Sequence, residues 1–213
     1  MSNERSDQEL LDAWGEGDKT AGDALLARHF DGLYRFFRTK LDGPIDDLIQ
    51  ETLLACVEGR ARYRGDAPFH VYMLGIARRM LLRHFRKRYR RGKVFATDEL
   101  SVCDIGGAPS VSMRGKLVRG QEVDLLLAAL RRLPIDLQIT LELRYWEEVP
   151  LPRIAEVTEV EVGTVKSRLA RARQKLEREM AKIADGDEAW ARETSSGLET
   201  WAAGVRQRIA DST

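Results

Sequence analysis

Apolar residues recur at steps of three and four along almost the whole chain. Leu26, Phe30, Leu33, Phe37 and Leu41 are one such series, and this spacing places them in one stripe along a helix. No stretch of useful length alternates between apolar and polar residues as a half-buried strand does. The pattern therefore predicts an all-α protein.

The helical pattern is lost over one long stretch, residues 94–120. Periodicity disappears there while Gly, Ser and Pro accumulate, which is typical of a flexible linker. We therefore expect two small helical domains, residues 1–95 and 121–181, joined by a flexible linker at 96–120. A C-terminal extension at 182–213 follows, with an amphipathic helical pattern formed by Leu198, Trp201, Val205 and Ile209.

Composition is that of a globular protein: 213 residues, 43% hydrophobic and 32% charged, with a formal net charge of +1. The N-terminal stretch MSNERSDQELLDAW is polar and acidic and lacks the apolar core of a signal peptide. No segment approaches the roughly 20 apolar residues that a membrane-spanning helix needs. We therefore expect a cytoplasmic protein with no membrane insertion.

No set of residues suits catalysis or metal binding. The two cysteines and three histidines have the spacing of neither a disulfide framework nor a metal site. No Gly-rich phosphate loop and no Ser/His/Asp or Cys/His set can be assembled. The tight acidic pairs, Asp46-Asp47 and Glu147-Glu148, lie where a helix start or a loop accounts for them. We therefore expect no enzyme, no metal and no cofactor.

A helix-turn-helix pattern lies in the second predicted domain, which we expect to contain four helices. A short apolar helix around Ile154 is followed by a turn of four to five residues and a longer helix with a buried stripe. That longer helix, Val162–Arg178, concentrates basic residues on an otherwise acidic domain, as a DNA recognition helix does. The candidates for contact with base edges are Thr164, Lys166, Ser167 and Arg168, and those for phosphates are Arg171, Arg173 and Lys175. A surface helix with solubilising charges is the alternative.

A second basic stretch, residues 78–93, holds nine Lys or Arg residues and no acidic residue. Its helical periodicity, which begins at Phe69, places Arg78, Arg79 and Arg86 opposite an apolar arc, with Arg83 at the border. Aromatic residues are interleaved with this charge, and unpaired bases need such flat surfaces for stacking. Tyr63 and Tyr72 are the best candidates. The alternative is a set of core aromatics beside a solvated basic tail.

An acidic helical face in residues 44–59 carries a leucine among polar residues. The face collects Asp47, Gln50, Glu51, Leu54 and Glu58. An exposed leucine in this setting suits an anchor for a partner protein, although single exposed leucines are also common on solvated faces.

Three segments together resemble one protein family. They are DDLIQETLL, FHVYMLGIARRMLLRHFRKRYRR and LPIDLQITLELRYW followed by IAEVTEVEVGTVKSRLARARQKL. In this order, with a linker between them, they resemble the extracytoplasmic-function (group IV) sigma factors of bacterial RNA polymerase over about residues 20–95 and 121–180. The resemblance implies a subunit that binds core polymerase and directs promoter recognition, DNA melting and transcription initiation.

Two other classes of protein remain as alternatives. One is a stand-alone helix-turn-helix transcriptional regulator with an extra basic domain. The other is an anti-sigma factor or scaffold, which the lack of a zinc-type His/Cys cluster and the presence of both basic segments disfavour.

The resemblance also implies roles for particular residues. Asp47, Gln50, Glu51 and Leu54 match the face that docks on the largest polymerase subunit, while the second domain would also contact the second-largest subunit. The helix Val162–Arg178 matches the reader of the minus-thirty-five element. An anti-sigma factor is a further expected partner. The segment that matches the reader and melter of the minus-ten element contains Arg62, Tyr63, Arg64, Tyr72, Arg78, Arg79, Arg83, Arg86 and Lys87.

The chain departs from the family pattern at several positions. Tyr72, Arg79 and Arg83 stand where the family usually carries Trp, Asn and Asp. In the helix-turn-helix, Pro150 replaces a Ser-type helix cap, and Glu159 replaces the usual turn glycine. Because such a turn often needs a left-handed residue, we expect local strain at Glu159.

Overall fold

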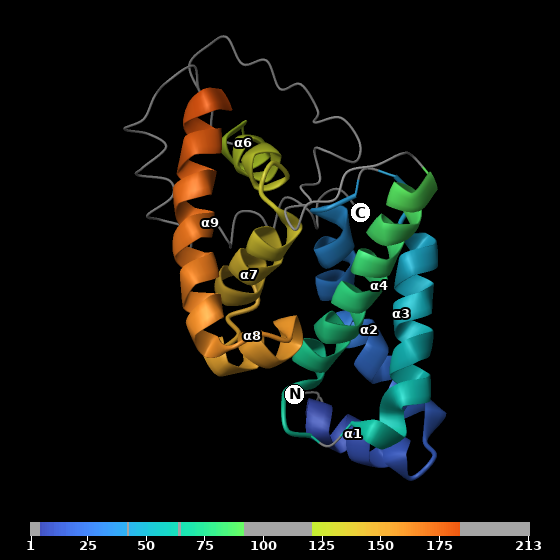
Figure 1. Ribbon diagram of the computed structural model, residues 1–213. Coiled ribbons are helices and arrows are strands. Elements are labelled where there is room, and N and C mark those ends of the chain that lie inside the picture. The colour runs from blue at the N-terminus through green and yellow to red at the C-terminus, as the bar shows by residue number, and fades with distance from the viewer. Residues whose placement is uncertain (1–4, 42, 64, 92–120, 184–213) are drawn as a thin grey trace. The chain divides into compact units, whose positions relative to one another are not determined.

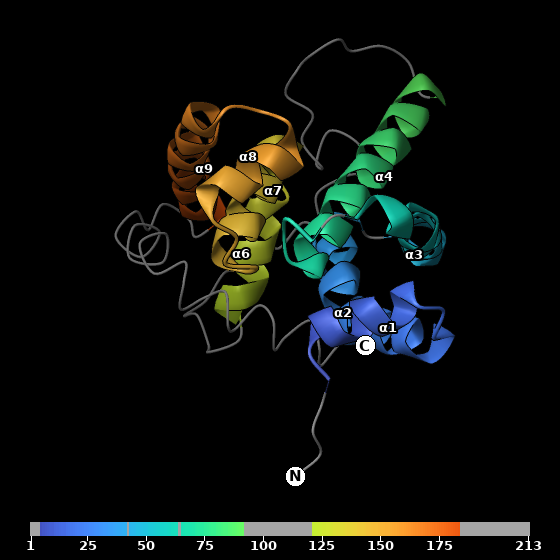
Figure 2. The same cartoon turned by 90° about the horizontal axis from the view of Figure 1, so that it is seen from below.

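The structure is a computed structural model that describes residues 5–41, 43–63, 65–91 and 121–183. The predicted linker at 96–120 and the C-terminal extension from residue 184 lie outside these ranges. Within them, all regular structure is helical (Figures 1 and 2), so the predicted all-α class is confirmed. The chain divides into two compact units, Met1–Arg83 and His84–Thr213, and the division falls within one long helix, α4.

The first unit contains α1 (Asp7–Gly15), α2 (Lys19–Arg38), α3 (Asp46–Gly59), the short 3₁₀ helix η1 (Arg60–Arg62) and most of α4 (Phe69–Arg91). Its core is built from the apolar stripes that the periodicity predicts. The stripe of α2 is an example, because Leu33 and Phe37 are fully buried while Leu26 and Phe30 are partly exposed. Other buried side chains are Leu10 and Trp14 of α1, Leu48 and Cys56 of α3, and Phe69, Met73 and Leu81 of α4.

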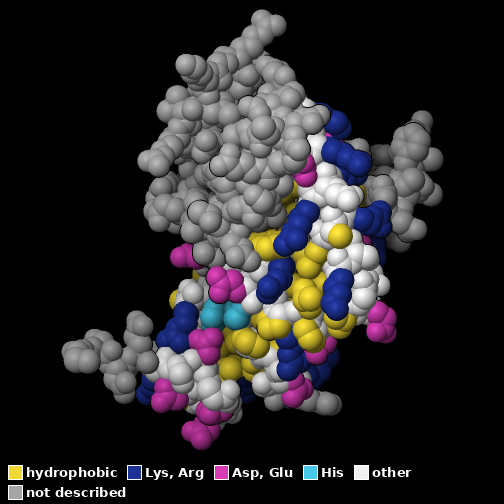
Figure 3. Space-filling view, turned by 90° about the vertical axis from the view of Figure 1, so that its left-hand side faces the viewer, with side chains coloured by type: hydrophobic (Ala, Val, Ile, Leu, Met, Phe, Trp, Pro, Cys, Tyr) yellow, Lys and Arg dark blue, Asp and Glu magenta, His cyan; other side chains and the backbone are white. Residues whose placement is uncertain are grey.

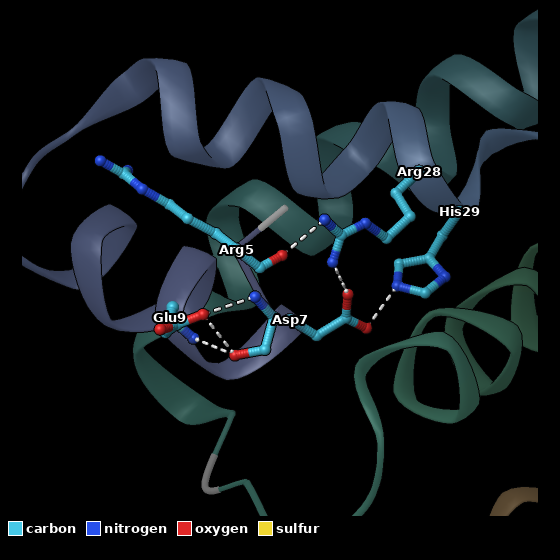
Figure 4. Close-up of polar contacts among 6 residues, drawn as sticks. Arg5, Asp7, Glu9, Arg28 and His29 are labelled. Carbon is cyan, nitrogen blue, oxygen red and sulfur yellow. Dashed lines mark hydrogen bonds and ion pairs between the residues drawn. The ribbon is translucent and has the colours of Figure 1, made fainter. Parts of the chain in front are cut away.

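Polar contacts at the N-terminus of α1 attach this helix to α2. Ser6 caps the helix in a capping box with Glu9. The Asp7 carboxylate then accepts hydrogen bonds from Arg28 Nη1, at 2.7 Å, and contacts His29 Nε2, at 2.6 Å. Figure 4 shows this carboxylate between the two side chains of α2. Arg28 Nη2 also donates to the carbonyl of Arg5, at 2.6 Å, so α2 holds both the start of α1 and the residue before its cap.

The second unit contains α6 (Gln121–Leu130), α7 (Ile135–Tyr145), α8 (Leu151–Thr158) and α9 (Val162–Ile183). The predicted four-helix domain is therefore present, with α9 packed against each of the other three helices. Pro134 and Pro150 precede α7 and α8, and Pro152 lies in the first turn of α8, where a missing amide hydrogen is tolerated. The core includes Leu126, Leu130, Leu133, Ile139, Ile154, Val165, Ala172 and Leu176.

The turn between α8 and α9 is closed by a left-handed residue. Glu159 has φ 58° and ψ 44°, which confirms the expected left-handed conformation. The amide of Glu159 donates to Glu156 O at 3.2 Å, and the amide of Val160 donates to Ala155 O at 3.0 Å, as in a Schellman motif. A side chain in this conformation costs roughly 1–2 kcal/mol relative to glycine. The geometry of the helix-turn-helix is kept despite that cost.

Candidate nucleic-acid and polymerase interfaces

The acidic face of α3 is exposed along its length. Asp46 and Asp47 lie in the first turn, where carboxylates interact favourably with the helix dipole. Leu54 is 53% exposed, as the sequence pattern predicts, and Val57 beside it is 46% exposed. We call the exposed residues Asp47, Gln50, Glu51, Leu54 and Val57 the α3 face. Two adjacent apolar groups surrounded by carboxylates can anchor a partner protein and orient it by charge.

The basic residues of α4 divide between an exposed and a buried side. Arg79, Arg83, Arg86 and Lys87 are exposed. Arg78 is only 8% exposed, so its predicted place on the exposed cationic side is wrong. Val71, Leu74, Leu81 and Phe85 are buried at the same helical spacing, and Arg78 falls within their stripe because α4 is covered over a wider arc than one apolar stripe indicates. Of the other predicted positions, Arg62 is exposed and Arg64 lies outside the described residues.

The aromatic residues at the start of α4 form a cluster, which we define as Tyr63, Phe69 and Tyr72. The Tyr63 ring lies 5.0 Å from the Tyr72 ring and 5.9 Å from the Phe69 ring. Phe69 is buried, whereas the two tyrosines are partly exposed. The structure therefore brings the two predicted stacking residues together, with one edge of the cluster in the core and the other open to solvent.

Hydrogen bonds set the positions of both tyrosines. The Tyr63 hydroxyl donates to Ala67 O at 2.5 Å, and the Tyr72 hydroxyl donates to Gly59 O at 3.3 Å. Burial raises the pKa of each phenol above its ordinary value, and for Tyr63 the carboxylates of Asp7 and Asp66 raise it further. Both hydroxyls therefore remain protonated donors at neutral pH.

The exposed side of α9 carries the predicted recognition residues Thr164, Lys166, Ser167, Arg171 and Arg173. Lys and Arg side chains recur among hydrophobic ones on the face drawn in Figure 3. A helix of this kind can enter the major groove, with its N-terminal residues at the base edges and its later basic residues at phosphates.

Two arginines of α9 are held by the domain itself. The Arg168 side chain is only 19% exposed, and its Nη2 lies 3.4 Å from Asp136 Oδ2 of α7. The Arg173 guanidinium lies over the Tyr145 ring, 5.2 Å from its centroid, and contacts the Tyr145 hydroxyl. Arg168 is therefore less available to DNA than Lys166, whereas Arg173 remains exposed. These partners could not be predicted from the sequence, because each lies about 30 residues away along the chain.

Metal chemistry finds no support in the described part of the chain. No group of three or more His, Cys, Asp or Glu residues there could hold a metal ion. Burial raises the pKa of the Cys56 thiol to about 12, and a thiol that stays protonated is a poor metal ligand. None of the described helices is long and apolar enough to cross a membrane.

Family models for two sigma-70 regions match this chain. The model described as sigma-70 region 2 matches residues 25–91, which run from α2 through α4, and that described as sigma-70, region 4 matches residues 124–176. The ECF RNA polymerase sigma factor SigM of Mycobacterium tuberculosis is 31% identical over 181 residues, which cover 83% of this chain and 85% of the relative. This chain belongs to the ECF RNA polymerase sigma factors.

A further relative agrees with this assignment, and a solved structure shares the fold. The ECF RNA polymerase sigma-E factor of Escherichia coli is 26% identical to this sigma factor over 182 residues, which cover 83% of this chain and 95% of the relative. The structure of CnrH in complex with the cytosolic domain of CnrY has the same fold, with a TM-score of 0.59 and 20% identity. The match covers 86% of this chain and 99% of that one.

Membership of this family confirms the function predicted from the sequence. The protein is an alternative sigma factor that binds core RNA polymerase and promoter DNA and directs promoter recognition. The stand-alone regulator is therefore the wrong alternative. Sigma factors as a family are not enzymes.

Proposed function

We propose that this sigma factor docks on core polymerase through the α3 face and reads promoter DNA with two separate basic surfaces. The single observation that carries this proposal is the exposure of Leu54 and Val57 among carboxylates. Apolar groups that a folded domain leaves in water gain most from burial in a partner. The largest polymerase subunit is the proposed partner of this face, and the second-largest subunit would contact the second unit.

The proposed minus-ten surface combines the aromatic cluster with the exposed basic residues of η1 and α4. Arg62, Arg79, Arg83, Arg86 and Lys87 supply positive charge for the phosphates. Tyr63 and Tyr72 offer partly exposed rings to a base that has left the duplex, at about 1–3 kcal/mol per stacked base. Such stacking offsets part of the few kcal/mol that each unstacked base costs. Arg64 remains a candidate, and Arg78 has the weakest case because it is buried.

The proposed minus-thirty-five surface is α9. Thr164, Lys166 and Ser167 are the candidates for base edges, and Arg171, Arg173 and Lys175 for phosphates. Arg168 would serve mainly to hold α9 on α7 through Asp136. We also propose that the domain boundaries follow the sequence pattern, with residues 96–120 linking the two DNA readers across the promoter spacer.

An anti-sigma partner and a cytoplasmic location are also part of the proposal. CnrH is bound to the cytosolic domain of CnrY in its structure, which supports an anti-sigma factor as a partner of this chain. A subunit that works on DNA as part of polymerase acts in the cytoplasm. We propose that it has no catalytic activity of its own.

Co-elution with core polymerase tests the docking face. Wild-type protein at micromolar concentration should co-elute with core in size exclusion, and the double variant Leu54→Asp, Glu51→Lys should not. Its melting temperature should stay within a few degrees of wild type, since both side chains are exposed. Ala24→Asp, at an exposed position of α2, is the matched control. Retained co-elution of the double variant would refute the α3 face as the docking site.

Permanganate footprinting tests the melting surface. A promoter recovered by run-off transcription of genomic DNA with the reconstituted holoenzyme supplies the template. Tyr72→Ala should lower the reactivity of thymines near the start site while leaving core binding intact. Unchanged thymine reactivity would exclude Tyr72 from DNA opening.

A further inference from the structure

The sigma-70 region 2 model matches the chain only from residue 25, so α1 lies outside the matched region. The last turn of α1 nevertheless contacts the segment that carries the aromatic cluster. Trp14 of α1 is 5% exposed. Arg60 Nη1 donates to the Trp14 carbonyl at 2.7 Å, and the Arg60 guanidinium lies 5.4 Å from the centroid of the Trp14 ring. One residue of α1 thus holds one arginine by a hydrogen bond and a cation–π contact.

Arg60 in turn helps to position Tyr63. It begins η1, and its carbonyl accepts the amide of Tyr63 at 3.0 Å. The preceding residue, Gly59, accepts the hydroxyl of Tyr72 at 3.3 Å. Both tyrosines of the aromatic cluster, which are partly exposed, are therefore hydrogen-bonded to the two residues at which α3 ends and η1 begins.

The other side of Trp14 is fixed by a glycine of α2. A Cβ added at Gly22 would lie 2.6–2.8 Å from three atoms of the indole ring, closer than packed atoms approach one another. Only a residue without a side chain allows this approach. The indole therefore lies against Gly22 of α2 and within cation–π distance of Arg60, so displacing the ring alters its contact with the arginine.

We propose that Trp14 is a positioning residue for promoter melting, which acts through Arg60 to hold Tyr63 and Tyr72 in the orientation that receives an unpaired minus-ten base. The inference rests on the proposed role of the aromatic cluster. It assigns to α1 a part in DNA opening that requires no contact of α1 with DNA.

Gly22→Ala is the test variant, because its methyl group displaces the indole although no residue of α1, η1 or the cluster is itself substituted. Gly15→Ala is its matched control, since a Cβ at Gly15 meets no atom within 4 Å. Amide hydrogen exchange of free protein should accelerate over residues 59–63 in Gly22→Ala, with exchange in the core of α2 and α4 unchanged. Gly15→Ala should exchange as wild type does.

Binding of holoenzyme to DNA gives the second measurement. The probe is a fork-junction DNA from the recovered promoter, with an unpaired non-template strand over the minus-ten element. Gly22→Ala should weaken binding to this probe about tenfold, the size of a misplaced stacking contact, and leave binding to core polymerase and to the duplex upstream element unchanged. Wild-type exchange rates together with wild-type affinity would overturn the proposal, as would an equal loss in core binding, which marks a merely structural role.

A second variant covers the case in which Gly22→Ala unfolds. Arg60→Met keeps the length of the side chain but removes its charge and hydrogen bonds, and it should show the same exchange and binding changes. The double variant Gly22→Ala, Arg60→Met should lose no more affinity for the fork-junction DNA than the weaker-binding single variant, because both substitutions act on one contact. Additive losses would mean that Arg60 contacts DNA directly, against the proposal. If wild-type holoenzyme failed to prefer the fork junction over duplex, the proposed function would fail, while hydrogen exchange would still decide whether Trp14 holds the cluster.

Discussion

Arg83 of α4 forms an ion pair with Glu51 of α3, so a side chain proposed to face DNA is bound to one proposed to face polymerase. Both are largely in solvent, with 64% and 50% of their side chains exposed. An exposed pair of this kind contributes about 0–1 kcal/mol. The pair therefore holds little of the fold, and either partner can exchange it for a contact in the holoenzyme.

A charge swap tests which contact of Glu51 matters. Glu51→Lys should weaken binding to core polymerase at least tenfold, the loss of roughly 1.4 kcal/mol or more of partner contact. Adding Arg83→Glu restores an ion pair of opposite polarity within the protein and should not restore co-elution with core. Recovery in the double variant would show instead that Glu51 acts through Arg83. The free energies of unfolding of all three proteins, measured by urea denaturation, should agree within about 1 kcal/mol.

Lys166 and Arg168 should behave differently although they are two residues apart on α9. Lys166→Ala should leave stability within about 0.5 kcal/mol, because the side chain is exposed. It should lower discrimination at the minus-thirty-five element by about 1–3 kcal/mol if it contacts a base edge. Gel shifts of holoenzyme on specific and scrambled DNA distinguish a base contact from a phosphate contact, because loss of a phosphate contact would weaken binding to both probes alike.

Arg168→Ala should mainly lower stability. Loss of the guanidinium removes the cation that lies 3.4 Å from Asp136, and we expect the free energy of unfolding of the second unit to fall by about 1 kcal/mol. Thermal melts followed by circular dichroism measure this. A variant as stable as wild type but unable to discriminate promoters would make Arg168 a base reader after all.

Glycine at position 159 should relieve the strained turn. Glu159→Gly removes a side chain from the left-handed region, and we expect the second unit to gain about 0.5–1 kcal/mol after the extra freedom of the unfolded chain is subtracted. Glu156→Gly, three residues earlier within α8, is the matched control and should cost about 0.5–1 kcal/mol. A destabilised Glu159→Gly would show that the glutamate makes a contact worth more than its strain.

The attachment of α1 should weaken in acid. Burial alone would raise the pKa of Asp7, but hydrogen bonds from Arg28 and His29 lower it more, so that its pKa lies below the ordinary value of 3.8. A group with a lowered pKa stabilises the fold above its ordinary pKa and loses this contribution as the pH falls through the folded value. Asp7→Asn should therefore melt a few degrees below wild type at pH 7, and the difference should shrink below pH 3.8.

Asp31→Asn, on the exposed part of α2, serves as the control for that comparison. It should melt close to wild type across the same pH range. A difference between Asp7→Asn and wild type that persisted unchanged in acid would mean that the Asp7 charge contributes nothing and that the substitution acts by shape alone.

Local patterns predicted those features that depend on one helix or one turn. Exposure of Leu54 follows from its place among Asp47, Gln50 and Glu51, because at 100° per residue these share one side of α3. The left-handed Glu159 follows from the short connection between two helices. Each prediction needed only residues that are neighbours in the chain.

Features that depend on two surfaces of a helix were predicted less well. Arg78 was expected in solvent because it lies opposite the most obvious apolar stripe of α4. Its burial in line with Leu74 and Leu81 shows that α4 is covered over a second arc. Val57 was missed for the converse reason: a valine on a helix is expected to be covered, and whether anything covers it depends on the neighbouring elements.

The helices, their order, the helix-turn-helix and the resemblance to the family could all be predicted from the sequence, because periodicity and short motifs are set by residues close along the chain. Which charged groups form contacts within the fold depends instead on how the helices pack. Arg168 with Asp136 and Arg60 with Trp14 are separated by 32 and 46 residues, and no local pattern specifies such pairs. They arise from the packing of whole helices, which brings distant side chains within hydrogen-bond distance and leaves Lys166, Leu54 and Val57 open to solvent.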